Sequence, residues 1–217
     1  MNLQQIATYT ATKLGIADAA TLEVAKAFAR ARWEMIWNHS LWRQTRHEAT
    51  VAVPAGTQNV ELPPEFELVH AVRWGNTQLL AGILDLSALA NDPVALGTVG
   101  PVLGFSPLGK TAGGLARVRL HRTPNEAGTI FVVGKRTCIP LAADTDAPLL
   151  AGASECLCAY TMGDLMQWQR QLSKANAYFE EAGALLAKML EIETAQTTEP
   201  RQLVPYTQQL EDSPGQY

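Results

Sequence analysis

The 217-residue sequence predicts an α+β fold, in which N-terminal helices and a long C-terminal helix pack together, with an inserted antiparallel β domain and an extended C-terminal arm. Apolar residues recur at helical spacing near both ends of the chain. The middle alternates apolar and polar residues between turns that contain glycine or proline. The predicted boundaries are 1–43 and 147–193 for the helical domain, 44–146 for the β domain and 194–217 for the arm.

The first segment predicts two helices. Residues 2–14 have helical apolar spacing, and Gly15 follows in the position of a C-cap. Either Asp18 or Thr21 can cap the second helix, because both side chains accept hydrogen bonds from the first turn. This second helix is predicted to run to about Trp42.

Three tryptophans, Trp33, Trp37 and Trp42, mark the end of the second predicted helix. Tryptophan buries a large apolar area, so this cluster is expected to anchor the helix to a partner surface. The favoured partner is the core of the domain itself, and the alternative is a contact with another chain. His39 and His47 flank the cluster without acidic or cysteine partners at ligand spacing, which argues against a metal site.

The middle of the chain predicts short strands joined by tight turns instead of crossover helices. Residues 45–53 and 58–62 predict a hairpin around a Pro-Ala-Gly turn, and 66–74 turns through Gly75 and Asn76 into 78–80. Further predicted elements are a single helical turn at 85–90, a long surface loop at 91–114, and strands at 115–121 and 129–137. Strands connected in this way form an antiparallel sheet.

The last helix is predicted over 154–193, a stretch without proline that begins with Ser154 as its N-cap. An unbroken helix of this length would measure about 60 Å, which exceeds the width of a domain of this size. A bend is therefore expected near Gly163 or Gly183, where helix propensity drops. Its apolar stripe comprises Leu165, Trp168, Leu172, Ala175, Phe179, Ala182, Leu186 and Met189.

Composition excludes several classes of protein. The net charge of −4 argues against a dedicated nucleic-acid binder, which needs Lys and Arg to neutralise phosphates. No apolar run approaches the roughly 20 residues of a membrane span, and the N-terminus lacks the pattern of a secretory signal. Cys156 and Cys158 are two apart on a predicted helix, which suits neither a disulfide nor a shared metal. With Cys138 as the third cysteine, the compartment is expected to be reducing.

Residues 104–111, GFSPLGKT, match the phosphate-binding loop Gly-x-x-x-x-Gly-Lys-Ser/Thr. That loop works between a buried strand and a helix whose N-terminus faces the phosphate. Here two glycines and a β-alternating run follow the motif, so a structural loop is the favoured interpretation. A nucleotide-binding enzyme that uses Gly104–Thr111 remains the alternative. No catalytic arrangement is supported elsewhere, so we expect no enzyme and no cofactor.

The order of elements resembles a family of structural phage proteins. An N-terminal helical segment ends in WEMIWNHSLW, and a strand and turn with paired prolines follow as ATVAVPAGTQNVELPPEF. Next come HAVRWGNTQL, a variable loop and VRLHRTPNEAGTIFVVGKR, and then DTDAPLL leads to the long helix. This layout resembles the head-to-tail adaptor (connector) proteins of tailed phages, the class that includes tail tubular protein A of short-tailed phages.

The resemblance implies a ring, commonly a dodecamer, that docks beneath the portal protein and meets a tail or nozzle protein on its distal side. Genomic DNA would pass through the ring without sequence-specific binding, and no membrane would be involved. The protein would lie in the virion neck after assembly in the host cytoplasm. A monomeric protein-interaction module is a further alternative. The residues expected at a subunit or portal interface are Trp33, Trp37, Trp42, Leu203, Tyr206, Leu210 and Tyr217.

Overall fold

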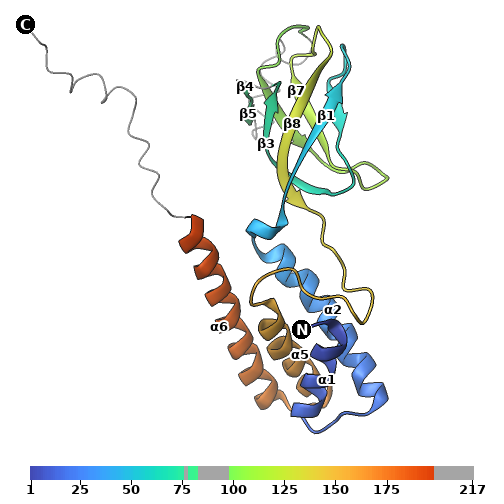
Figure 1. Cartoon of the computed structure of the whole chain (residues 1–217), viewed down its shortest axis with the longest axis vertical. Coiled ribbons are helices and arrows are strands. Elements are labelled where there is room, and N and C mark those ends of the chain that lie inside the picture. Colours follow the sequence, from blue (N-terminus) through green and yellow to red (C-terminus); the bar gives the residue numbers. More distant parts are fainter. Residues whose placement is uncertain (76–77, 83–97, 198–217) are drawn as a thin grey trace, which may run out of the picture.

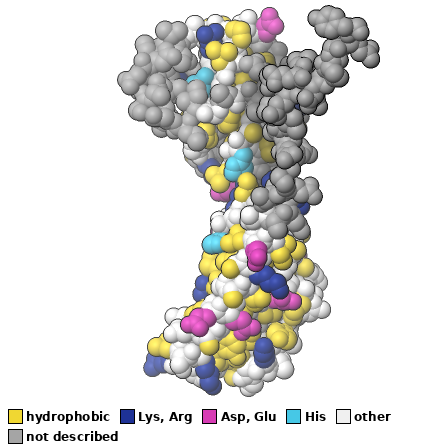
Figure 2. Space-filling view, turned by 90° about the vertical axis from the view of Figure 1, so that its left-hand side faces the viewer, with side chains coloured by type: hydrophobic (Ala, Val, Ile, Leu, Met, Phe, Trp, Pro, Cys, Tyr) yellow, Lys and Arg dark blue, Asp and Glu magenta, His cyan; other side chains and the backbone are white. Residues whose placement is uncertain are grey.

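The structure, a computed structural model, describes residues 1–75, 78–82 and 98–197. It contains a helical domain and a β domain that lie end to end, joined by a narrow neck (Figures 1 and 2). The predicted α+β fold is confirmed, with the strands inserted between helices from the two ends of the chain. The helical domain comprises α1 (Leu3–Lys13), α2 (Ala19–His39), α5 (Ala153–Trp168) and α6 (Leu172–Thr197).

Local capping determines where the first two helices begin. The Asn2 side chain accepts a hydrogen bond from the Gln5 amide at 2.8 Å, and the Gln5 side chain accepts one from the Asn2 amide at 2.9 Å. Gly15 follows α1 with a φ of 71°, as a C-capping glycine does. Asp18, and not Thr21, caps α2, because its carboxylate accepts from the Thr21 amide at 2.9 Å.

The tryptophan cluster forms the core of the helical domain, as the favoured interpretation predicted. Trp33, Trp37 and Trp42 are each 2% exposed or less. The indole N–H of Trp33 donates to the Ile139 carbonyl at 2.7 Å, and that of Trp37 donates to the Arg136 carbonyl at 3.1 Å. These bonds tie α2 to the segment that leaves the β domain. α2 ends at His39, so Trp42 lies beyond the helix and not at its end as predicted.

The C-terminal stretch forms a helical hairpin and not one long helix. The prediction of a break near Gly163 or Gly183 is wrong, because the chain turns between Trp168 and Leu172, where Arg170 has a φ of 62°. The Gln171 amide donates to the Met166 carbonyl at 2.8 Å and closes the end of α5. Gly163 lies where α5 approaches α6 closely, and Gly183 faces open space.

The first helix of the hairpin also begins at a different residue than predicted, and only part of the predicted apolar stripe is buried. Gly152 is the N-cap of α5, and Ser154 lies inside the helix instead of capping it. Trp168 and Leu172 flank the turn and are largely exposed, so they leave the predicted buried stripe. Leu165 and Met189 remain buried, one on each arm of the hairpin.

The β domain is a sandwich of two sheets and not the single sheet that was expected. Its strands are β1 (Arg46–Val53), β2 (Asn59–Glu61), β3 (Phe66–Trp74), β4 (Gln78–Leu79), β5 (Ala81–Gly82), β6 (Gly104–Leu108), β7 (Arg117–His121) and β8 (Gly128–Arg136). Within the described ranges, one sheet has the order β1-β8-β3-β4 and the other β2-β7-β6-β5. Their inner faces share one apolar core, which includes Val53, Val60, Val118 and Ile130.

Strand pairing differs from the prediction at two places. β1 pairs with β8 and β2 with β7, so the predicted hairpin of 45–53 with 58–62 does not form, because the turn after Val53 crosses between the sheets. Part of the predicted 91–114 loop is strand β6. The turn at Gly75 does join antiparallel strands, since β3 pairs with β4 as predicted. The helical turn predicted at 85–90 lies outside the described residues.

The segment 137–152 returns from the sandwich and crosses the first two helices. The carbonyl oxygens of Asp146 and Asp144 accept hydrogen bonds from the first amides of α1, at 2.8 and 3.1 Å. The Asp144 carboxylate also accepts from Lys26 Nζ at 2.8 Å, which fixes the segment to α2. At the neck, Lys135 Nζ of β8 donates to the Ser40 carbonyl at 3.1 Å. The two domains are therefore held together by side-chain contacts to backbone as well as by the chain itself.

Candidate interaction surface

The structure does not place the predicted interface residues on an accessible surface. Trp33 and Trp37 are enclosed in the helical core and offer no area to a second subunit or a portal protein in this conformation. Trp42 is also buried, and only its edge borders a surface groove. The other predicted interface residues lie outside the described part of the chain: Leu203, Tyr206, Leu210 and Tyr217. The predicted arm also begins later than expected, since α6 continues through 194–197.

The phosphate-loop motif has the geometry of a strand. Residues Gly104–Leu108 form β6 and pair with β7. Lys110 Nζ contacts the Glu67 carboxylate at 2.7 Å, and Thr111 Oγ1 accepts from the Leu115 amide at 3.0 Å. The chain then enters β7, so no helix N-terminus follows the motif to hold a phosphate.

The three cysteines and the buried pair of Ser106 and His121 lie in settings that suppress reactivity. Burial raises the pKa of the Cys156 thiol to about 12 and that of Cys138 and Cys158 to about 11, so these thiols stay protonated at neutral pH. Ser106 Oγ lies 2.7 Å from His121 Nε2, and both residues are buried. His121 Nδ1 has no hydrogen-bond partner, so no carboxylate orients this pair as in a triad.

The described residues offer neither a metal site nor a membrane-spanning helix. They contain no group of three or more His, Cys, Asp or Glu placed to hold a metal ion. Their helices are too short or too polar to cross a membrane. The arrangement that stands out is therefore a surface and not a chemical site.

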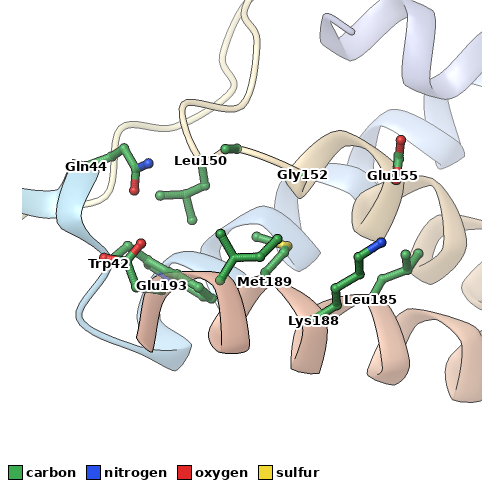
Figure 3. Close-up of a pocket in the computed structure, with 11 residues that line it drawn as sticks. Trp42, Gln44, Leu150, Gly152, Glu155, Leu185, Lys188, Met189 and Glu193 are labelled. Carbon is green, nitrogen blue, oxygen red and sulfur yellow. The ribbon is translucent and has the colours of Figure 1, made fainter. Parts of the chain in front are cut away.

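A groove of about 260 Å³ lies beside the C-terminal half of α6, and we call it the α6 groove (Figure 3). Leu150 comes from the crossing segment, Leu185 and Met189 come from α6, and Trp42 closes one end (Figure 3). Ile192 extends the apolar lining and is 50% exposed. The groove is lined by Trp42, Gln44, Leu150, Ala151, Gly152, Glu155, Leu185, Lys188, Met189, Ile192 and Glu193.

Charged groups surround this apolar floor. Glu155 lies in the first turn of α5, and the Glu193 carboxylate accepts a hydrogen bond from the Arg43 amide at 2.6 Å. Lys188 is exposed at the rim and forms no ion pair within the described part of the chain. The groove thus combines an apolar floor with one cation that is available to a partner.

The α6 groove belongs to a larger apolar flank. A second hollow between α1, α5 and α6 shares Glu155 and Leu185 with it and includes Tyr9, which is 45% exposed. Hydrophobic side chains cover much of this side of the helical domain (Figure 2). Exposed apolar patches are typical of surfaces that contact a protein, a ligand or a membrane.

Sequence reasoning missed this flank, although one signal was present. Met189 belongs to the predicted stripe, and Leu185 and Ile192, at helical spacing from it, widen that stripe on one side. The other half of the groove comes from Trp42 and Leu150, which lie more than a hundred positions apart. No local pattern can bring these segments together.

The chain matches no family model and no curated protein. The fold and the apolar flank are consequently the observations from which a function can be argued.

Proposed function

We propose that this protein is a structural component of a tailed-phage virion that assembles into a ring between the portal and the tail. In this proposal it acts in the neck, after assembly in the host cytoplasm, and leaves a central conduit for the genomic DNA. It performs no catalysis and needs no cofactor. The order of sequence elements, which resembles that of head-to-tail adaptor proteins, favours a dodecamer.

The observation that carries the proposal is the exposed apolar flank of the helical domain beside α6. An isolated protein gains nothing from keeping Ile192 and Tyr9, which are 50% and 45% exposed, in water, whereas an oligomer would cover them. Burial of such surface is the main driving force of subunit association.

The two-domain shape supports the same function. The helical domain and the sandwich lie at opposite ends of the molecule (Figure 1). Copies placed side by side would present one layer of helical domains and one layer of sandwiches. A ring of this form can contact a different partner at each end, the portal on one side and a tail or nozzle protein on the other.

The charge of the chain is compatible with a DNA conduit. The net charge of −4 gives no general attraction for phosphates, so DNA could move through the ring instead of binding to its wall. A basic lining would slow the passage, because each neutralised phosphate adds affinity.

The test is assembly of the full chain, alone and with the portal protein from the same genome. Sedimentation velocity and negative-stain electron microscopy should show rings that are promoted by the portal. Monomers under both conditions would contradict the proposal. Binding of one copy to one partner, without rings, would favour the interaction module instead.

A further inference from the structure

The chain that continues from α6 starts next to the α6 groove. Ile192 and Glu193 line the groove, and α6 ends about one turn later, at Thr197. Residues 198–217 follow in the sequence and lie outside the described residues. A short connection of this kind gives the segment an effective concentration at the groove on the order of a millimolar. Even a weak affinity for the groove would then keep it occupied.

The lengths allow this segment to turn back along the groove. From Ile192 to Thr197 the helix rises by about 7.5 Å. From Thr197 to Leu203 an extended chain spans up to about 20 Å. Pro200 disfavours helical geometry at the residue before it, so the sequence predicts that the chain leaves the axis of α6 there. Leu203 can therefore return to the level of Ile192.

The apolar residues of the segment have the spacing of those in the groove. The two prolines in 200–206 favour the polyproline II conformation, which has three residues per turn. In that conformation Leu203 and Tyr206 lie on one side, about 9 Å apart. Ile192 and Leu185 of the groove are separated by about 10 Å of helix and both reach the solvent. Leu203 at Ile192 would thus place Tyr206 at Leu185.

The segment and the groove also have opposite charge. The charged residues of the groove lining are Glu155, Lys188 and Glu193, which give a net charge of −1. Residues 200–210, PRQLVPYTQQL, contain Arg201 as their one charged side chain and therefore carry +1. The acidic residues of the segment lie on either side of this stretch: Glu199, Glu211 and Asp212.

From these observations we propose that residues 200–210 fold back and occupy the α6 groove of their own chain. Leu203 packs against Ile192, and Arg201 lies close to the Glu193 carboxylate. The segment covers the groove in the free subunit, so a neighbour or a portal protein that uses this surface must first displace it. This inference concerns the free subunit and goes beyond the proposed ring.

Cross-linking of the full chain tests the position of the segment. Cys138 is replaced by serine, because the other two cysteines are buried. A short bis-maleimide should join Lys188→Cys to Thr207→Cys within one chain, measured by mass spectrometry of the monomer. Ala187→Cys with Thr207→Cys is the matched control, since Ala187 is an exposed neighbour outside the groove lining. We expect at least fivefold more cross-link at position 188 than at position 187.

Substitutions within the segment test the apolar contacts. Leu203→Asp combined with Tyr206→Asp should reduce the cross-link at position 188 to the level of the 187 control, because the groove floor is apolar. Gln202→Asp combined with Gln208→Asp adds the same charge without removing an apolar residue, and it should retain most of the excess. Circular dichroism shows whether each variant is folded.

A synthetic peptide with the sequence of 198–212 provides a second measurement. Fluorescence anisotropy should show that it binds the Leu203→Asp, Tyr206→Asp chain at least tenfold more tightly than the wild type, whose own segment competes. Addition of Ile192→Asp to the released chain should abolish this binding, since it places a charge on the groove floor. Equal binding to wild type and to the released chain would contradict the proposal.

The outcomes separate this inference from the proposed function. Equal cross-linking at positions 187 and 188 would overturn the inference. Dimers formed from a mixture of Lys188→Cys chains and Thr207→Cys chains, in place of the link within one chain, would make a second copy the occupant and overturn it as well. Both measurements use the free chain, so either failure leaves ring formation with the portal standing. Monomers in the presence of portal, together with an intact 188–207 link, would instead contradict only the proposed function.

Discussion

Gly163 of α5 lies directly against the aromatic ring of Phe179 of α6. A Cβ atom at position 163 would come within 2.5 Å of the Phe179 ring. The glycine therefore allows the two arms of the hairpin to approach each other, and it does not bend the helix. Phe179 in turn lies under the Arg32 guanidinium, at 5.3 Å from the ring centroid, so the contact extends to α2.

The two glycines of this hairpin should respond to alanine in opposite ways. Gly163→Ala should lower the free energy of unfolding by about 1–3 kcal/mol, because the added methyl group overlaps the Phe179 ring. Gly183→Ala should raise it by about 0.5–1 kcal/mol, since that position is open and alanine favours the helix. Urea denaturation measures both. Addition of Phe179→Leu should relieve part of the cost of Gly163→Ala, and an unchanged cost would show that ring contact is not its cause.

The ion pair between Arg32 and Asp164 should be the most sensitive polar contact of the helical domain. Arg32 donates through Nε at 2.8 Å and through Nη2 at 2.6 Å, and the Asp164 side chain is almost fully buried. Asp164→Asn should cost about 2–3 kcal/mol, at the lower end for buried pairs because Arg32 remains partly hydrated.

Glu23→Gln provides the matched control for that ion pair. It removes a surface carboxylate from Lys26 and should change the free energy of unfolding by less than about 1 kcal/mol. Equal effects of Asp164→Asn and Glu23→Gln in thermal and urea denaturation would contradict a special role for the buried pair.

Stability should fall at mildly acidic pH because of His121. Burial, with a smaller effect of the Arg119 charge, lowers its pKa below the ordinary value of 6.5. The unfolded chain then binds the proton more readily than the folded one, so stability is complete above about pH 6.5 and decreases below it. His121→Gln should make the melting temperature less sensitive to a change from pH 7.5 to 5.5. Ser106→Ala keeps the buried imidazole and should retain the wild-type pH dependence.

Lys110→Ala separates the structural and nucleotide-binding interpretations of GFSPLGKT. The substitution removes a partly exposed ion pair with Glu67, so it should cost about 0–1 kcal/mol of stability. Isothermal titration calorimetry with millimolar Mg-ATP should show no binding by the wild type. Saturable binding that disappears in Lys110→Ala would revive the nucleotide-binding alternative.

The sequence predicts local structure well wherever interactions between residues close in sequence determine it. Asn2 and Asp18 accept hydrogen bonds from nearby amides, so α1 and α2 begin close to the predicted residues. Strand β3 has its predicted bounds, and Gly75 turns the chain into β4 with a φ of 58°. Hydrophobic spacing also identified Trp33 and Trp37 as core residues.

The predictions fail where contacts between distant segments of the chain determine the structure. Alternation shows which side of a strand is buried, but not which sheet the strand joins. The turns after β1 and before β8 meet through a bond from the Gly56 amide to the Pro124 carbonyl at 2.8 Å, and no local pattern encodes this meeting. The hairpin turn at Arg170 was missed because it lacks glycine and proline. The α6 groove was missed because three distant segments build it.

The insertion of the sandwich into the helical domain also sets the order in which the chain can fold during its synthesis. The sandwich, from β1 to β8, is contiguous, so all its strands have been translated before α5. The helical domain must wait, because its core joins Trp33 to Leu186 and Met189, and carbonyls of the crossing segment cap α1. At typical elongation rates the ribosome needs about 3–10 s to proceed from Arg136 to Met189. Throughout this interval Trp33 and Trp37 of α2 remain unburied, so we expect chaperones to bind the nascent chain until its last helix emerges.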